Sequence, residues 1–138
     1  KVLDINKKFM AECNNNGMSD FFNNVYKEFD IYYKDRQFEY EQLLVYYVYR
    51  YFLDAVYDYN IILKIKNAIV GYLVLKHADV AKWYINGKTL SKDEQIDMAH
   101  LYSRQFEHSY SNFEVYSENF CTMRKYAYNN LLKILCNT

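Results

Sequence analysis

The chain has 138 residues, the size of one ordinary domain, which is long enough to bury a core without disulfides or metals. Hydrophobic residues make up 51% and aromatic residues 20% of it, which excludes a disordered segment. The 17 acidic and 17 basic side chains cancel. We therefore expect no nucleic-acid partner, because such binding draws on an excess of lysine and arginine.

The absence of proline and the presence of only three glycines leave few breaks for the many turns of a β-sandwich or barrel. The sequence predicts one helical domain over residues 1–138, an all-α compact bundle of five to seven helices around a central antiparallel hairpin. The most apolar run, Ala68 to Leu75, is far shorter than the roughly 20 residues that span a bilayer, so we expect no membrane segment.

The first two helices are predicted from apolar residues at helical spacing. One runs from about Val2 to Cys13 and stops at the NNNG sequence of residues 14–17, with Gly17 as a left-handed cap. The next starts near Ser19, a candidate N-cap, and continues to about Tyr33. The KDRQ sequence at 34–37 is the following turn candidate.

The third and fourth predicted helices form the hairpin. Residues 38–57 are apolar or aromatic around most of the helix circumference, which predicts a largely buried central helix. The fourth helix reaches about Tyr84 and ends at the Asn86-Gly87 pair.

Two capping boxes open the last predicted helices. Ser91 with Glu94 starts a fifth helix that reaches about His108. Ser111 with Glu114 starts a final stretch that reaches about Leu135.

Cysteine and histidine spacing gives no metal site. The three cysteines, Cys13, Cys121 and Cys136, form no CxxC pair, which favours buried thiols and a cytoplasmic location. His100 and His108 stand about 12 Å apart along one helix, too far to share an ion.

Arg50 lies in the helix predicted to be most buried, where a guanidinium needs a carboxylate or an anionic ligand. Asp54, four residues later, and Glu107 are the candidate partners. The tyrosines around Arg50 follow helical spacing, which favours core packing over a platform that stacks on nucleic-acid bases.

Two segments, LLVYYVYRYF at 43–52 and LYSRQFEHSYSN at 101–112, resemble the C-terminal helical region of the flagellin lysine-N-methylase family. KIKNAIVGYLVLKHADVAKWYINGK at 64–88 and SKDEQID at 91–97 resemble that family's middle helices and capped turn. The resemblance covers roughly residues 40–118, and the N-terminal third adds little to it.

This resemblance implies methyl transfer to flagellin lysines by a longer protein whose N-terminal half carries a cysteine-rich cluster. The chain lacks that cluster, so it looks like the C-terminal part of such a protein and is expected to be inactive alone. S-adenosylmethionine and a metal cluster would belong to the full-length protein, with no cofactor within this chain. The implied partners are flagellin and the cysteine-rich half.

The resemblance also marks candidate site residues. Arg50 comes from the first segment, and four more polar residues come from the second: Tyr102, Arg104, Glu107 and His108. We expect them to form one buried network across two facing helices, in which the arginines pair with Glu107 or with an incoming anionic group.

Two alternatives stay open at this point. One is the ligand-binding and dimerisation domain of a TetR-like transcriptional regulator, which would favour a homodimer through an apolar helix interface. The other is a structural interaction bundle without a ligand pocket.

Overall fold

The computed structural model describes residues 2–15, 18–104, 127, 129–131 and 133. Over these residues the chain forms five α-helices, one short 3₁₀ helix and no strand, which confirms the predicted all-α class. Contacts divide the chain into two compact units, residues 1–37 with 75–102 and residues 38–74 with 103–138. We call them unit 1 and unit 2. The expectation of one domain stays a prediction.

Unit 1 contains α1 (Val2–Asn15), α2 (Met18–Tyr32), η1 (Lys34–Arg36), the second half of α4 (Ile61–Ile85) and α5 (Lys92–Tyr102). Its core is aromatic and joins three helices. The Phe9 ring of α1 lies 5.7 Å from the Tyr84 ring of α4, and the Phe29 ring of α2 lies 5.5 Å from the Trp83 ring. Phe9, Phe29 and Trp83 are all buried.

The first two helices match the predicted ranges closely. Phe9 and Cys13 are buried one turn apart on α1, as the apolar spacing predicts. Val25 and Phe29 are likewise buried one turn apart on α2. The predicted turn at 34–37 is the 3₁₀ helix η1. Gly17 lies outside the described residues, so its role as a cap stays a prediction.

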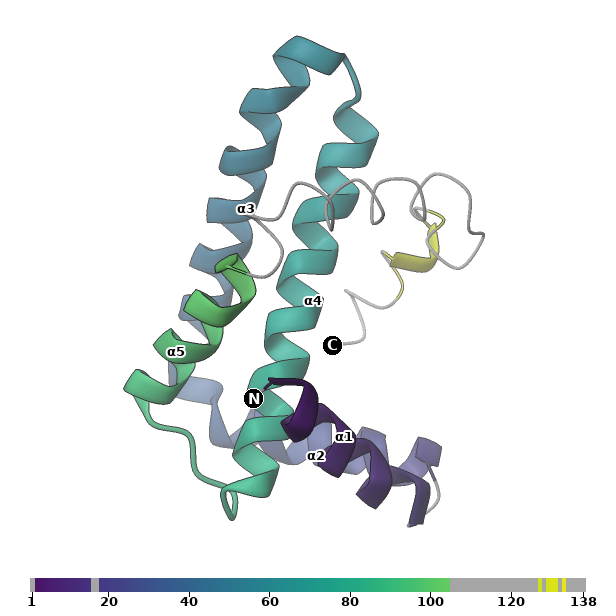
Figure 1. Cartoon of the computed structure of the whole chain (residues 1–138), viewed down its shortest axis with the longest axis vertical. Helices are drawn as coiled ribbons and strands as arrows, with labels where there is room; N and C mark the ends of the chain where they lie inside the picture. Colours follow the sequence, from purple (N-terminus) through teal and green to yellow (C-terminus); the bar gives the residue numbers. More distant parts are fainter. Residues whose placement is uncertain (1, 16–17, 105–126, 128, 132, 134–138) are drawn as a thin grey trace. The chain divides into compact units, whose positions relative to one another are not determined.

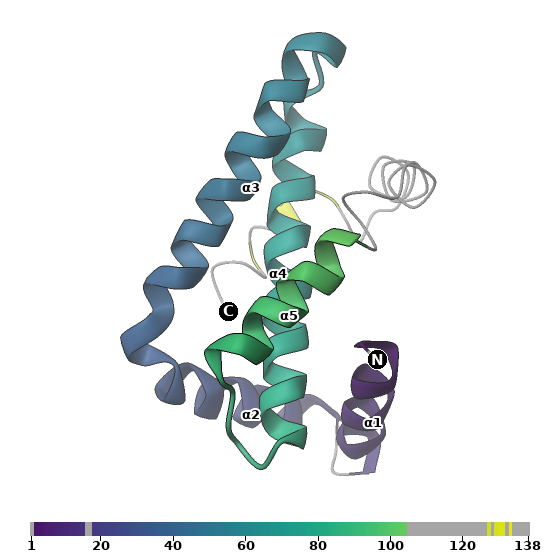
Figure 2. The same ribbon diagram turned by 60° about the vertical axis from the view of Figure 1, so that its left-hand side comes forward.

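The described part of unit 2 is mainly the predicted hairpin of α3 (Gln37–Asp58) and the first half of α4. Figures 1 and 2 both show these segments side by side and antiparallel. The rings of Tyr40 and Tyr72 pack edge to face across it, with centroids 6.0 Å apart. At the bend Tyr59 takes a left-handed φ of 55°, and Asn60 Oδ1 accepts a hydrogen bond from Leu63 N, which caps α4.

The prediction that α3 is largely buried is wrong. Its buried residues, Tyr40, Tyr47, Tyr51 and Ala55, form a single stripe. The opposite side is exposed although it is apolar, because a neighbouring helix covers only one face of α3. We call this side the α3 apolar face, and it consists of Val45, Tyr46, Val48, Tyr49, Phe52, Leu53, Val56 and Tyr57.

The turn between α4 and α5 forms as the Asn86-Gly87 pair predicts. Gly87 has φ +72°, Lys88 N donates to Trp83 O at 2.9 Å, and Gly87 N donates to Tyr84 O at 3.2 Å. These two bonds make a Schellman motif, which satisfies carbonyls at the end of α4. Lys88 also has a positive φ, of 65°.

The predicted capping box at the start of α5 is confirmed. Ser91 Oγ accepts from Glu94 N at 3.2 Å, and Glu94 Oε2 accepts from Ser91 N at 3.1 Å. α5 ends at Tyr102. The predicted continuation to His108 and the second capping box at Ser111 fall outside the described residues. Near the C-terminus, residues 129–131 and 133 are helical.

Among the described residues, no helix combines the length and apolar character that crossing a bilayer requires.

Candidate functional site

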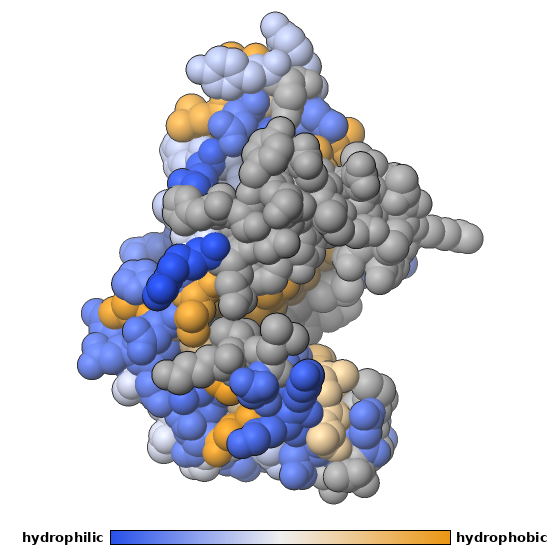
Figure 3. Space-filling model, viewed as in Figure 1, coloured by the Kyte–Doolittle hydropathy of each residue, from blue (hydrophilic) through white to orange (hydrophobic). Residues whose placement is uncertain are grey.

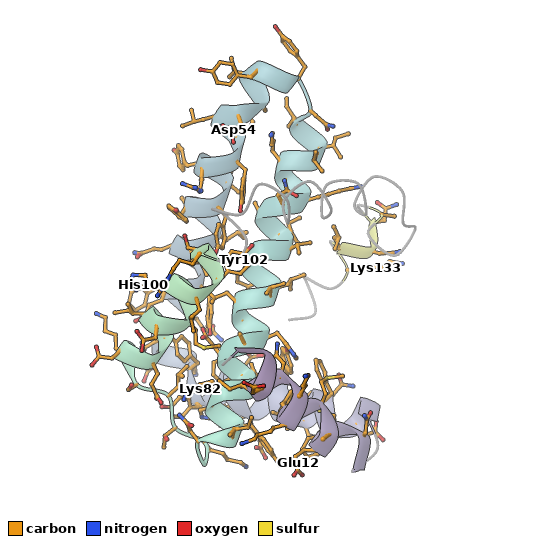
Figure 4. The ribbon with its side chains drawn as sticks, viewed as in Figure 1. Glu12, Asp54, Lys82, His100, Tyr102 and Lys133 are labelled. Atoms are coloured by element: carbon orange, nitrogen blue, oxygen red, sulfur yellow. The ribbon has the colours of Figure 1, made fainter. Side chains whose placement is uncertain are left out.

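The five residues proposed from sequence fall in different parts of the chain. Arg50 lies on α3 in unit 2, and Tyr102 is the half-buried last residue of α5 in unit 1. Arg104 follows two residues later and is exposed. Glu107 and His108 lie outside the described residues. Figure 4 shows Tyr102 at the end of α5 and Asp54 on α3. The network that would join these residues stays a prediction, but the predicted burial does not hold for Arg50 and Arg104, which are both exposed.

The expectation that Arg50 is buried is wrong, because Arg50 is exposed on α3. It lies one turn from Asp54, which is exposed on the same helix. An exposed guanidinium keeps most of its hydration. The desolvation argument for an obligatory anionic partner therefore does not apply to Arg50.

No three His, Cys, Asp or Glu side chains within the described part of the chain are arranged to hold a metal ion. Asp97 and His100, which have the i, i+3 spacing of a ligand pair, are both exposed on α5. The described residues therefore do not fit a metal cluster, and we assign none of them to one.

The polar side chains that the structure does bring together lie in unit 1, between α2 and the second half of α4. Lys76 Nζ forms an ion pair with Asp30 Oδ1 at 2.9 Å, and the Lys76 side chain is almost fully buried. On the next residue of α4, His77 Nδ1 shares a hydrogen bond of 2.7 Å with the Tyr26 hydroxyl. Two neighbouring residues of α4 thus bind two residues of α2.

His77 is surrounded by aromatic rings. The rings of Phe22 and Tyr26 stack on it at 5.9 and 6.3 Å, and the Phe9 ring meets it edge on at 5.7 Å. Burial lowers the pKa of His77 below its ordinary value, since an imidazolium would lose its hydration there. A neutral His77 joins α1, α2 and α4 by packing and by its bond to Tyr26.

A second polar cluster surrounds Glu94 at the start of α5. Its carboxylate accepts from Ser91, from Asn86 Nδ2 at 2.6 Å, and pairs with Lys82 Nζ at 3.3 Å. The hydrogen bond from the Ser91 backbone is the main cause that lowers the pKa of Glu94. This cluster binds α5 to the end of α4, near the labelled Lys82 in Figure 4.

Further contacts attach α2 and η1 to the segment after α4. Arg36 donates to Gln95 Oε1 at 2.8 Å, and Lys88 Nζ pairs with Glu28 at 2.6 Å. The Tyr32 hydroxyl accepts from Leu90 N at 3.2 Å. Together with the Glu94 cluster, these contacts fix the path of the chain into α5, the helix that carries Tyr102.

Cys13 on α1 is buried, in agreement with the expectation of a structural thiol. Burial is the main cause that raises the pKa of its thiol. A thiol in this state is a poor nucleophile. Cys121 and Cys136 lie outside the described residues.

Sequence reasoning missed the polar pairs of unit 1. The signal that could have found them is the sequence LVLKHADVAKW at 73–83, where Lys76, His77 and Asp79 interrupt the most apolar helix of the chain. Lys76 and Asp79 are buried. Charged residues at buried positions require polar partners from neighbouring helices.

A search against protein families matches residues 1–136 to the FliB lysine N-methylase C-terminal domain. The match extends beyond the 40–118 region suggested by the sequence resemblance, and it includes α1 and α2. No significant match exists among curated proteins or solved structures. The family match favours the methylase interpretation over a regulator domain or a structural bundle. The chain belongs to the FliB lysine N-methylase family, as its C-terminal domain.

Proposed function

We propose that this chain is the helical domain that supports methyl transfer to flagellin lysines in a FliB-type methylase, at a site built mainly by the rest of that protein. The observation that carries the proposal is the family match over residues 1–136. S-adenosylmethionine as methyl donor and flagellin as substrate follow from this membership. The reaction takes place in the cytoplasm, a location that the cysteine pattern also favours.

Within this proposal, α5 has a specific task. The Glu94 cluster and the Arg36–Gln95 bond fix the start of α5, and so orient the helix that leads to Tyr102 and Arg104. The proposed polar network of Arg50, Tyr102, Arg104, Glu107 and His108 contributes charged groups toward the substrate or the methyl donor. The exposed Arg104 is available to an anionic group supplied from outside the domain.

The experiment uses the intact methylase that carries this domain, with flagellin and S-adenosylmethionine as substrates. Arg104→Ala and His108→Ala are each expected to lower the methylation rate at least tenfold, on the order of the loss of one charge-assisted hydrogen bond. Lys27→Ala, at an exposed position of α2, is the matched control that removes a cation elsewhere.

Thermal unfolding of each variant separates a site role from a folding role. A lower rate with an unchanged unfolding temperature supports the proposal. Conversely, unchanged methylation in both variants, at unchanged stability, would contradict the assignment of these residues. An intact protein that transfers no methyl group to any lysine substrate would contradict the function itself.

A further inference from the structure

The turn between α4 and α5 contains a reactive pair of residues that neither the fold nor the proposed function uses. Asn86 is followed directly by Gly87. In such a pair the backbone nitrogen of the glycine can attack the side-chain carbonyl carbon of the asparagine, because glycine has no side chain that shields the nitrogen. A Cβ added at Gly87 would meet no atom within 4 Å, so the space beside this residue is open.

Water reaches this turn. Gly87, Lys88 and Thr89 are exposed, and Asn86 is half-buried. In Figure 3 hydrophilic residues, drawn in blue, predominate at the lower end of unit 1, where Figure 1 shows the turn. The water needed to hydrolyse a product of this attack is therefore available at the site.

The hydroxyl group of Thr89 assists the attack. The nitrogen of Gly87 must lose its proton, and the negative charge then spreads onto the carbonyl oxygen of Asn86, which belongs to the same peptide group. Thr89 Oγ1 donates a hydrogen bond to that oxygen at 3.0 Å. A donor directed at an oxygen that becomes negative lowers the barrier to this step. The bond from Gly87 N to Tyr84 O, at 3.2 Å, is at the long limit for a hydrogen bond.

The contact between Asn86 and Glu94 opposes the attack. Asn86 Nδ2 donates to Glu94 Oε1 at 2.6 Å, a short hydrogen bond to a charged acceptor eight positions further along the chain. Ring closure requires the carboxamide of Asn86 to rotate until its carbon lies against Gly87 N. The bond to Glu94 restricts that rotation, so the carboxamide is released only when the start of α5 detaches.

We propose that Asn86 is a deamidation site that is restrained by Glu94. Gly87 N loses its proton and forms a bond to Asn86 Cγ, the Cγ–Nδ2 bond breaks, and Nδ2 leaves with a proton as ammonia. Water then opens the succinimide at Cγ, which gives aspartate, or at the backbone carbonyl carbon, which gives isoaspartate. The net reaction consumes one water and releases one ammonia. This inference does not depend on the methylase function.

Deamidation changes the polar cluster around Glu94. Position 86 then carries a carboxylate in place of the amide donor, so Glu94 loses a hydrogen bond and gains a like charge nearby. Lys82, which pairs with Glu94 at 3.3 Å, becomes the cation that two carboxylates share. The start of α5 is therefore expected to detach more easily once Asn86 has reacted, and the loss of ammonia makes the change permanent.

The test incubates the intact protein that carries this domain at mildly alkaline pH and follows position 86 by peptide mapping with mass spectrometry. Conversion is measured by the gain in mass when an amide becomes an acid. Glu94→Ala is expected to convert roughly fivefold faster than the wild type, the effect of one lost hydrogen bond on the opening equilibrium. Thr89→Val added to Glu94→Ala is expected to slow the conversion again.

Two controls separate the release of Asn86 from general unfolding. Glu28→Ala removes the ion pair with Lys88 in the same turn but keeps the bond between Asn86 and Glu94, so its rate should equal that of the wild type. The other Asn-Gly pair of the chain, Asn16-Gly17, lies outside the described residues and is mapped in the same samples. Its rate should be the same in the wild type and in Glu94→Ala.

Three outcomes would overturn the proposal. If position 86 keeps its amide in both the wild type and Glu94→Ala, while a short synthetic peptide with the sequence of this turn converts, Asn86 is not a deamidation site of the folded protein. Equal conversion in the wild type and Glu94→Ala would exclude restraint by Glu94. Faster conversion of both Asn-Gly pairs in Glu94→Ala would likewise exclude it, since the variant would then act through general unfolding.

Discussion

The described parts of unit 1 and unit 2 contain ten aromatic residues each and use them differently. In unit 1 the rings come from three helices and enclose one another, so that Phe9, Phe29, Tyr33 and Trp83 are buried. In unit 2 the Tyr47 and Tyr51 rings stack 6.1 Å apart along a single helix, and the opposite face of α3 is exposed.

The difference shows that aromatic content does not by itself decide burial. A ring is removed from water only when helices surround it on several sides, as α1, α2 and α4 do around Phe9. A hairpin of two helices covers one stripe of each. Apolar residues beyond that stripe remain available for another surface.

The largest expected difference between the two units is the loss of stability when an aromatic ring is removed. Phe29→Ala in unit 1 removes a ring that contacts Tyr33 and Trp83, and we expect it to lower the free energy of unfolding by about 3–5 kcal/mol. Tyr57→Ala in unit 2 truncates a side chain that is 86% exposed, with an expected change within about 0.5 kcal/mol. Urea denaturation measures both. Equal losses would mean that the two units bury their rings alike.

A smaller effect is expected at the polar boundary of unit 1. Glu94→Ala removes the acceptor for Ser91 and Asn86 and the partner of Lys82, at a cost of about 1–2 kcal/mol. Glu94→Gln keeps a capping-box acceptor and should lose less.

The pH dependence of stability gives a second test of the role of Glu94. Because the pKa of Glu94 is lowered in the folded state, its stabilising contribution is present above the ordinary carboxylate pKa of ~4.3 and is lost as the pH falls. In Glu94→Gln that part of the acid destabilisation should vanish. Denaturation curves of wild type and variant that run parallel down to low pH would exclude the proposed role.

The smallest effect concerns His77. Its folded pKa lies below the ordinary value, so as the pH falls through ~6.5 the unfolded chain binds a proton that the folded chain does not. Stability therefore decreases, with a slope of at most about 1.4 kcal/mol per pH unit. His77→Gln should remove this slope, whereas His100→Gln, at an exposed site on α5, should keep it. Thermal unfolding at several pH values measures this slope. A slope that is unchanged in His77→Gln would contradict the assignment.

Local signals in the sequence were sufficient for the helix boundaries. The Asn86-Gly87 pair and the Ser91–Glu94 box act within one turn of the chain, and both form as predicted. Apolar spacing on α1 and α2 likewise identifies Phe9 and Phe29 as core residues.

The candidate site could not be predicted in the same way, because it depends on contacts between helices. The spacing of residues within one helix does not indicate such contacts. Arg50 was expected to be buried because its neighbours are apolar, but neighbours along a helix do not provide the covering surface. The pairs Lys76–Asp30 and His77–Tyr26 join residues about fifty positions apart, so spacing within one helix could not indicate them.

The helix α4 has a consequence for folding, because its 25 residues belong to both units, with the division between Val74 and Leu75. Propagating a helix adds one hydrogen bond for each residue that is fixed, while starting a new one is unfavourable. When one unit folds first, its part of α4 is already helical, so the other unit can extend that helix without a new nucleation step. Because the two units share this helix, we expect the unfolding of one unit to destabilise the other.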